Sequence, residues 1–182
     1  MPADTSLPMS VQSPDPLQAA MFVAAASVGA LLLAFVAEYV FAVAGCTLCI
    51  YQRVPYGLTA ALCGFAMVAR MPPPRLRLVF IACAALFAIG SAIALYHVGV
   101  QQGLWSEPGV CEAALPDPDA VIDLRSARAT RPACSEIDWS VMGLSLAALN
   151  AMYSAVLAAG CGFLATRVLG ASTGGRADTC AR

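Results

Sequence analysis

The sequence predicts an all-α membrane protein, a bundle of four transmembrane helices with both termini in the cytoplasm and two loops on the opposite, outer side. Two observations carry this prediction. The 182 residues are 60% hydrophobic and only 12% charged, with a mean hydropathy of +0.76, which is too apolar for a water-soluble globular domain. In addition, four long segments are almost free of charged residues.

The four predicted spans cover about residues 18–40, 50–69, 76–97 and 140–166. Each has about the 17 to 25 residues that a helix needs to cross about 30 Å of hydrocarbon, the second only if residues 50–53 contribute to its outer end. Three prolines, Pro72 to Pro74, predict a tight turn between the second and third spans. Alanine and glycine are frequent in the spans and favour close helix packing. We therefore expect one transmembrane domain over 18–167, with tails at 1–17 and 168–182.

Arginine positions predict the orientation of this bundle. Three arginines lie between the second and third spans and three follow the fourth span (Arg70, Arg75, Arg77, Arg167, Arg176 and Arg182). Because basic residues concentrate in cytoplasmic loops, both tails should be cytoplasmic and loops 41–53 and 98–139 should face the outer side. The N-terminal tail contains no lysine or arginine, so we expect a retained first helix and no cleavable signal peptide. All ten basic residues are arginines that form no basic stripe, and the net charge is −1, which argues against nucleic-acid binding.

Eight cysteines divide by predicted location. Cys63, Cys83 and Cys161 lie within spans, where we interpret them as small packing residues, and Cys180 lies in the C-terminal tail as an incidental cysteine. The other four lie in the outer loops (Cys46, Cys49, Cys111 and Cys134). Four cysteines on the side where disulfides persist predict two disulfides there.

The two outer pairs differ in what a bond would stabilise. A bond from Cys111 to Cys134 would close a loop of about 24 residues, worth about 3 kcal/mol in the chain-entropy model. A bond from Cys46 to Cys49 closes almost no loop, so a purely structural purpose for it is weak. The Cys-x-x-Cys spacing is instead typical of a redox-active dithiol.

Arg53 follows the Cys-x-x-Cys at helical spacing. If the segment is helical, Cys46, Cys49 and Arg53 lie on one face, with the guanidinium one turn beyond Cys49. Alternatively, Pro55 belongs to a first helical turn that starts near Gln52 and leaves Cys49 just outside the helix. Either geometry favours a thiolate at Cys49, through Arg53 or the helix dipole. Arg53 and Gln52 also have a simpler interpretation as interfacial residues at the end of a span.

His97 is the only histidine, and the sequence leaves two interpretations open for it. At the outer end of the third span it is typical of an interfacial packing residue, yet it shares the predicted depth of Cys49 and Arg53 and could hydrogen-bond a ligand there. Zinc is a competing use of the four outer cysteines. However, the second pair is separated by about 22 residues and neither loop contains a histidine, unlike a usual structural zinc site, so we predict no metal.

The chain resembles the disulfide-bond formation protein B (DsbB) family, the bacterial quinone-linked thiol oxidases. The resemblance covers nearly the whole chain outside the two tails. It is carried by the Cys46-Thr47-Leu48-Cys49-Ile50-Tyr51-Gln52-Arg53 motif, by Tyr96 to Trp105 leading to Cys111, and by Cys134 leading to Trp139 and Gly143 to Leu146. The chain departs from the family pattern at Gln52, where the family often has glutamate, and at His97, which aligns with the family histidine only within one residue.

This resemblance implies an electron path in a multi-pass protein of the bacterial inner membrane, with its active loops facing the periplasm. A reduced periplasmic thioredoxin-fold oxidase, a DsbA-like protein, would attack the Cys111–Cys134 disulfide, most favourably at Cys111. Cys134 would then exchange with Cys46 and release the Cys49 thiolate toward a membrane quinone, either ubiquinone or menaquinone. Arg53, His97 and Gln52 would form the quinone site, and Arg53 would stabilise the thiolate and polarise the quinone oxygen.

Two rival functions remain open at this stage. One is a non-enzymatic membrane protein whose outer cysteines bind metal or form structural disulfides. The other is a protein that carries electrons outward, which would need a reactive cysteine pair on the cytoplasmic side, and Cys180 alone does not supply one. We expect the thiol oxidase, a protein-dithiol:quinone oxidoreductase that forms disulfide bonds.

Overall fold

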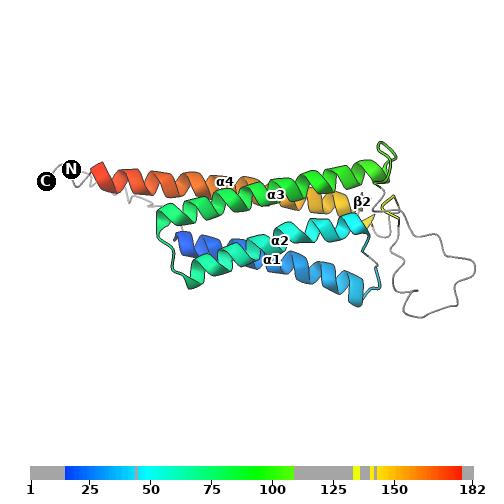
Figure 1. The fold of residues 1–182 in the computed structure, drawn as a ribbon, viewed down its shortest axis with the longest axis horizontal. Coiled ribbons are helices and arrows are strands. Elements are labelled where there is room, and N and C mark those ends of the chain that lie inside the picture. The colour runs from blue at the N-terminus through cyan, green and yellow to red at the C-terminus, as the bar shows by residue number, and fades with distance from the viewer. Residues whose placement is uncertain (1–14, 44, 109–132, 136–139, 142, 178–182) are drawn as a thin grey trace, which may run out of the picture.

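The structure is a computed structural model that describes residues 15–43, 45–108, 133–135, 140–141 and 143–177, with side chains in the last helix described as far as Val168. Its elements are α1 (Pro16–Tyr39), α2 (Thr47–Val68), α3 (Pro73–Gln101), β1 (Ser140–Val141), β2 (Leu144–Ser145) and α4 (Leu146–Ala177). The predicted helical architecture is confirmed: four helices run alternately up and down, and the α2–α3 turn lies at the same end as the start of α1 (Figure 1).

Three of the four helices described are long and apolar enough to cross a membrane, namely Pro16–Tyr39, Pro73–Gln101 and Leu146–Val168. The helix outside this set is α2, whose first half carries Gln52, Arg53 and Pro55. These residues lower its mean hydropathy, although it has 22 residues. A fourth span, and the side of the membrane on which each end lies, therefore stay predictions.

Local sequence determines where the first three helices begin. Asp15 caps α1 by accepting a hydrogen bond from the Leu17 amide at 3.0 Å, and Pro16 occupies the first helical position. Cys46 caps α2, accepting a hydrogen bond from the Cys49 amide. Proline also occupies the first turn of α3, where a missing N–H breaks no helical hydrogen bond.

The start of the last helix differs from the prediction. A helix was expected from Ser140, but residues 140–145 contain a short antiparallel hairpin in which Ser140 pairs with Ser145, and α4 begins at Leu146. Gly143 adopts a φ of +80° in the turn, a conformation that favours glycine. The segment Ser140 to Ser145 carries no charge and joins directly to the apolar run of α4, so the sequence predicts it as part of the helix, although Gly143 is a turn-forming residue.

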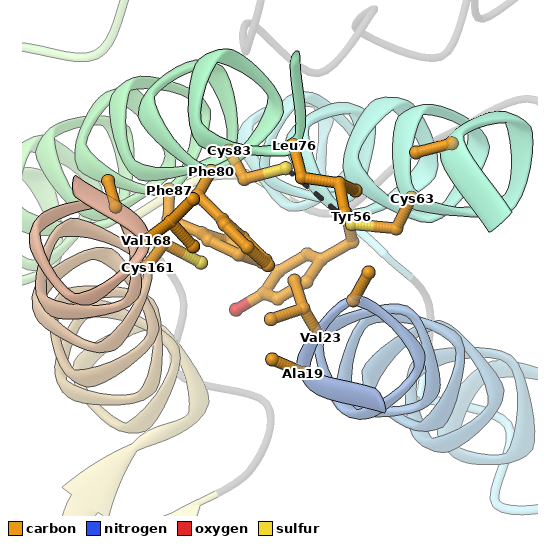
Figure 2. Close-up of a cluster of buried hydrophobic side chains, with 13 residues drawn as sticks. Ala19, Val23, Tyr56, Cys63, Leu76, Phe80, Cys83, Phe87, Cys161 and Val168 are labelled. Carbon is orange, nitrogen blue, oxygen red and sulfur yellow. Dashed lines mark hydrogen bonds between the residues drawn. The ribbon is translucent and has the colours of Figure 1, made fainter. Parts of the chain in front are cut away.

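The core lies between the helices in the half of the bundle away from this hairpin. Figure 2 shows Phe80 and Phe87 of α3 packed near Tyr56 of α2 and Val23 of α1. The Tyr56 and Phe87 rings meet edge to face with centroids 5.6 Å apart. In the packing of the bundle, α3 contacts mainly α4 and α2, and α2 contacts α1, whereas α1 and α4 contact each other little.

Candidate redox and ligand site

The Cys-x-x-Cys begins α2 at the hairpin end of the bundle. Cys46 is the N-cap residue and Cys49 lies in the first helical turn, so the expectation of a helix that starts near Gln52 is wrong. Pro55 is accommodated inside α2, next to Gly90 of α3, where a Cβ would lie 3.3 Å from the proline Cγ. The two sulfur atoms share a hydrogen bond at 2.9 Å, and the Cys49 amide lies 3.3 Å from the Cys46 sulfur.

His97 of α3 lies against this pair. Its Nε2 is 3.6 Å from the Cys46 sulfur and 3.1 Å from the Cys134 carbonyl oxygen, and its side chain is only 2% exposed. Its Nδ1 is 3.0 Å from the side-chain nitrogen of Gln52. The ring therefore bridges both segments that carry outer cysteines, and contact of His97 with a ligand stays a prediction.

Gln52 begins a buried polar network that sequence reasoning missed. Its Oε1 accepts a hydrogen bond at 2.6 Å from Asn150 of α4, which in turn accepts one at 2.6 Å from the Tyr56 hydroxyl. Ser154 lies 2.7 Å from that hydroxyl. Polar residues within apolar helices are a signal for such networks, since an unpaired polar group there is costly. Asn150, Tyr56 and Ser154 were therefore open to detection.

Arg53 lies one turn beyond Cys49, as predicted for a helical segment, but its ionic partner was not predicted. Its guanidinium forms a 2.5 Å ion pair with Glu38 near the end of α1, and it also stacks over the Phe35 ring, 5.4 Å from the centroid. A Cβ built on Gly45 would lie 3.0 Å from Arg53 Nη2, so the absence of a side chain there leaves room for the guanidinium. Glu38 thus supplies the nearby negative charge that Gln52 lacks.

These residues line a cavity of about 640 Å³ between α1, the start of α2 and the start of α4. Its wall is mainly apolar side chains of α1 and α4, with polar groups gathered at one part of it (Cys46, Cys49, Gln52, Arg53, Tyr56, His97, Asn150 and Tyr153). Both the volume and the composition, apolar with a few convergent polar groups, are typical of sites for small organic ligands. Part of the cavity lies where α1 and α4 make little contact with each other.

The electrostatics of the dithiol place the thiolate at Cys46, whereas the sequence favoured Cys49. The hydrogen bond shared with the Cys49 thiol, aided by His97 and the Cys49 amide, lowers the pKa of Cys46 to about 4, although burial opposes this shift. The same hydrogen bond, together with burial, raises the pKa of Cys49. The reason for the difference is the position of Cys46 as the helix cap, where donors converge on its sulfur.

The outer cysteines are found in two states. Cys46 and Cys49 are free thiols, so the expected disulfide between them is not formed in this structure, whereas Cys134 is disulfide-bonded. Cys111, its predicted partner, lies outside the described residues, and the pairing stays a prediction. Cys134 is fully buried in a cluster with Cys46, Leu48 and Val100, against which Cys49 also packs. The structure therefore brings Cys46, Cys49, Cys134, Arg53, His97 and Gln52 together at one end of the bundle.

Comparison with known proteins supports the assignment that the motif suggested. The family model described as "Disulfide bond formation protein DsbB" matches residues 17–164, which include all four helices at least in part. No curated protein and no solved structure gave a significant match. Since the matched region covers most of the 182 residues, the chain belongs to the disulfide bond formation protein DsbB family.

Proposed function

We propose that this protein is a membrane thiol oxidase that reoxidises a DsbA-like periplasmic thioredoxin-fold protein and passes the electrons to a membrane quinone. The observation that carries the proposal is the position of the Cys46–Cys49 dithiol. It lies in the wall of an apolar cavity on one side and against the disulfide-bonded Cys134 on the other. A relay that carries electrons from a protein disulfide to a lipid-soluble acceptor needs a dithiol that is next to the disulfide and next to a cavity for the acceptor.

The cavity residues fit a quinone. A ring with an isoprenoid chain needs apolar walls, which α1 and α4 supply, and its carbonyl oxygens need hydrogen-bond donors, which the Arg53 guanidinium can provide. When bound, a quinone supplies an acceptor for two electrons and two protons. Gln52 and Asn150 orient the His97 ring through the network that links them.

The proposed exchange between cysteines is balanced within the chain and its partner. The partner dithiol bonds to Cys111 as the Cys111–Cys134 bond breaks, and its second thiolate then completes the partner disulfide. Cys134, now a thiolate, bonds to Cys46 while the Cys46–Cys49 bond breaks and its electron pair remains on Cys49, which lines the cavity. Cys111, released as a thiolate when the partner disulfide closes, then bonds to Cys134 as the Cys46–Cys134 bond breaks, which leaves Cys46 and Cys49 as the reduced pair. The shared cluster of Cys46 and Cys134 supports this choice of attacked sulfur.

Arg53 and His97 would have different electrostatic roles in this sequence. The Arg53 guanidinium lines the cavity and its positive charge favours the thiolate form of Cys49, so it stabilises negative charge where the electrons leave the protein. His97 instead contacts the Cys46 sulfur and favours its thiolate. We propose that Glu38 positions Arg53 at the cavity wall through their ion pair.

Quinone reduction by the purified protein tests this function. The full chain in detergent is mixed with a reduced thioredoxin-fold partner and a soluble quinone, and quinone absorbance is followed. We expect turnover by the wild type and none by Cys49→Ser or Cys111→Ser, with Cys161→Ser as a matched control that retains it. Unchanged turnover in either Cys49→Ser or Cys111→Ser would eliminate the relay.

A further inference from the structure

The dithiol and His97 form a cluster of metal-ligating atoms that the sequence did not predict. The sulfur atoms of Cys46 and Cys49 and one ring nitrogen of His97 all lie within 4.8 Å of one another. Within the described part of the chain, no other three histidine, cysteine or acidic side chains are this close. The argument against zinc rested on the wide spacing of the second cysteine pair and on the absence of a histidine from the outer loops. The fold removes the second objection by bringing His97 in from α3, and the cluster does not use the second pair.

The distances are close to those of a zinc site. Zn–S bonds of about 2.3 Å and Zn–N bonds of about 2.0 to 2.1 Å place tetrahedral ligand atoms about 3.6 to 3.8 Å apart. The Cys46 sulfur and His97 Nε2 are already 3.6 Å apart. The two sulfurs, at 2.9 Å, would need to separate by about 0.9 Å to reach the spacing of two zinc-bound thiolates.

The surroundings of His97 match those of a metal ligand. A ligating histidine usually has its other ring nitrogen fixed by a hydrogen bond, and Gln52 lies 3.0 Å from Nδ1. Nε2 faces the Cys46 sulfur and also lies 3.1 Å from the Cys134 carbonyl oxygen, a contact that coordination would replace. Coordination through Nε2 requires the proton on Nδ1, and a turned Gln52 amide would accept it through its oxygen. Asn150, Tyr56 and Ser154 can each reverse their hydrogen bonds, so the network accommodates this change.

We propose that Cys46, Cys49 and His97 bind Zn²⁺ when the cysteines are in the dithiol form, with a fourth ligand reaching the ion from the cavity. Binding displaces the thiol protons and transfers no electrons. A disulfide offers no thiolates, so the oxidised form does not bind. Zinc therefore holds the pair reduced and prevents the Cys46–Cys49 disulfide from forming again. The binding itself does not depend on the proposed function, whereas inhibition of quinone reduction does.

Metal titration of the reduced full chain in detergent tests the site. We expect one Zn²⁺ per protein by competition with a chromophoric chelator, and, with Co²⁺, thiolate-to-cobalt charge-transfer absorption. Cys46→Ser and Cys49→Ser should abolish both signals, and His97→Gln should weaken binding at least about tenfold, as expected for loss of a ligand. Protein oxidised at Cys46 and Cys49 should bind no Co²⁺.

Two control variants make the result specific. The double variant Cys63→Ser, Cys83→Ser removes the other close thiol pair. The double variant Cys111→Ala, Cys134→Ala removes the two cysteines that follow α3. Both double variants should keep one metal site. Absence of the charge-transfer band from reduced wild type, or its loss only in the Cys63 and Cys83 variant, would overturn the proposal. A protein that binds zinc but, when free of metal, reduces no quinone would instead support the metal site and eliminate the proposed function.

Discussion

Among the residues that the structure describes, two pairs of thiols lie close together, and their surroundings differ completely. Cys46 and Cys49 have sulfurs 2.9 Å apart at the start of α2, beside His97, the Cys134 cluster and the cavity. Cys63 of α2 and Cys83 of α3 have sulfurs 3.7 Å apart, and both are fully buried among apolar side chains (Figure 2). Proximity of two thiols is therefore common to both pairs and does not by itself create a redox site.

The Cys46–Cys49 pair differs from the Cys63–Cys83 pair in its access to the cavity and in the charge of its surroundings. The Cys46 sulfur has three neighbouring hydrogen-bond donors, namely the Cys49 amide, His97 and the Cys49 thiol. The cavity gives a small molecule a route to Cys49. The Cys63–Cys83 pair does not line this cavity, and its neighbours in the core include Phe80, Phe87 and Cys161. A thiolate is the reactive species in exchange, so surroundings that stabilise it decide which pair reacts.

The largest expected difference between the pairs is in turnover. Cys46→Ser or Cys49→Ser should reduce quinone reduction to the uncatalysed background, because a serine cannot form or break the relay disulfide. Cys63→Ser or Cys83→Ser should retain nearly wild-type kcat, since serine is close to cysteine in size. The assay is quinone absorbance with a reduced partner protein. Equal loss of turnover in the Cys46 or Cys49 variants and in the Cys63 or Cys83 variants would show that the two pairs do not differ in redox function.

The thiolate of Cys46 predicts an unusual pH dependence of alkylation. With the pKa of Cys46 lowered to about 4, its thiolate population is nearly complete above pH 5. An ordinary thiol with a pKa of 9.0 is about 0.1% thiolate at pH 6 and gains about tenfold per pH unit below its pKa. Iodoacetamide labelling of Cys46, followed by mass spectrometry, should therefore change little between about pH 5 and 8. A rate that rises tenfold per unit over this range would contradict the assignment.

Removal of the cavity charge should have the next largest effect. Arg53→Ala should lower kcat for quinone reduction about 10²-fold, the loss typical for one preorganised charge or donor at a reacting group. Arg53→Lys serves as the matched variant, because it keeps the charge but loses the planar stacking over Phe35. Substantial rescue by lysine would assign the effect to charge, and an alanine variant with unchanged kinetics would exclude Arg53 from the site.

The smallest effect is expected at Glu38, which acts only through Arg53. Glu38→Gln should raise the quinone KM several-fold while kcat changes less, because an amide holds the guanidinium by a weaker hydrogen bond than a carboxylate does. In an Arg53→Ala background the same substitution should have almost no further effect. Additive losses in the double variant would show that Glu38 acts independently of Arg53.

Much of the bundle could be predicted because apolar length and proline positions are local signals. The Cys46–Cys49 dithiol could be recognised for the same reason, since Cys46, Cys49 and Arg53 are close in sequence. The pairing of Glu38 with Arg53, the pairing of Asn150 with Gln52 and the position of the thiolate could not be derived, because they depend on how α1, α3 and α4 pack around α2. Glu38 was visible only as the first charge after an apolar run, with nothing local to pair it with Arg53. The hairpin before α4 was hidden for a related reason, as its residues are apolar enough to continue a helix.

Single-turnover oxidation of the reduced protein by a quinone, without any partner protein, tests the central claim most directly. The full chain is reduced, freed of reductant under anaerobic conditions and mixed with excess quinone, and the new disulfide is mapped by mass spectrometry after rapid acid quenching. The account predicts that quinone is reduced and that a Cys46–Cys49 disulfide forms first, also in the Cys63→Ser and Cys83→Ser double variant. Formation of a Cys63–Cys83 disulfide in its place, or no quinone reduction by the folded dithiol protein, would contradict it.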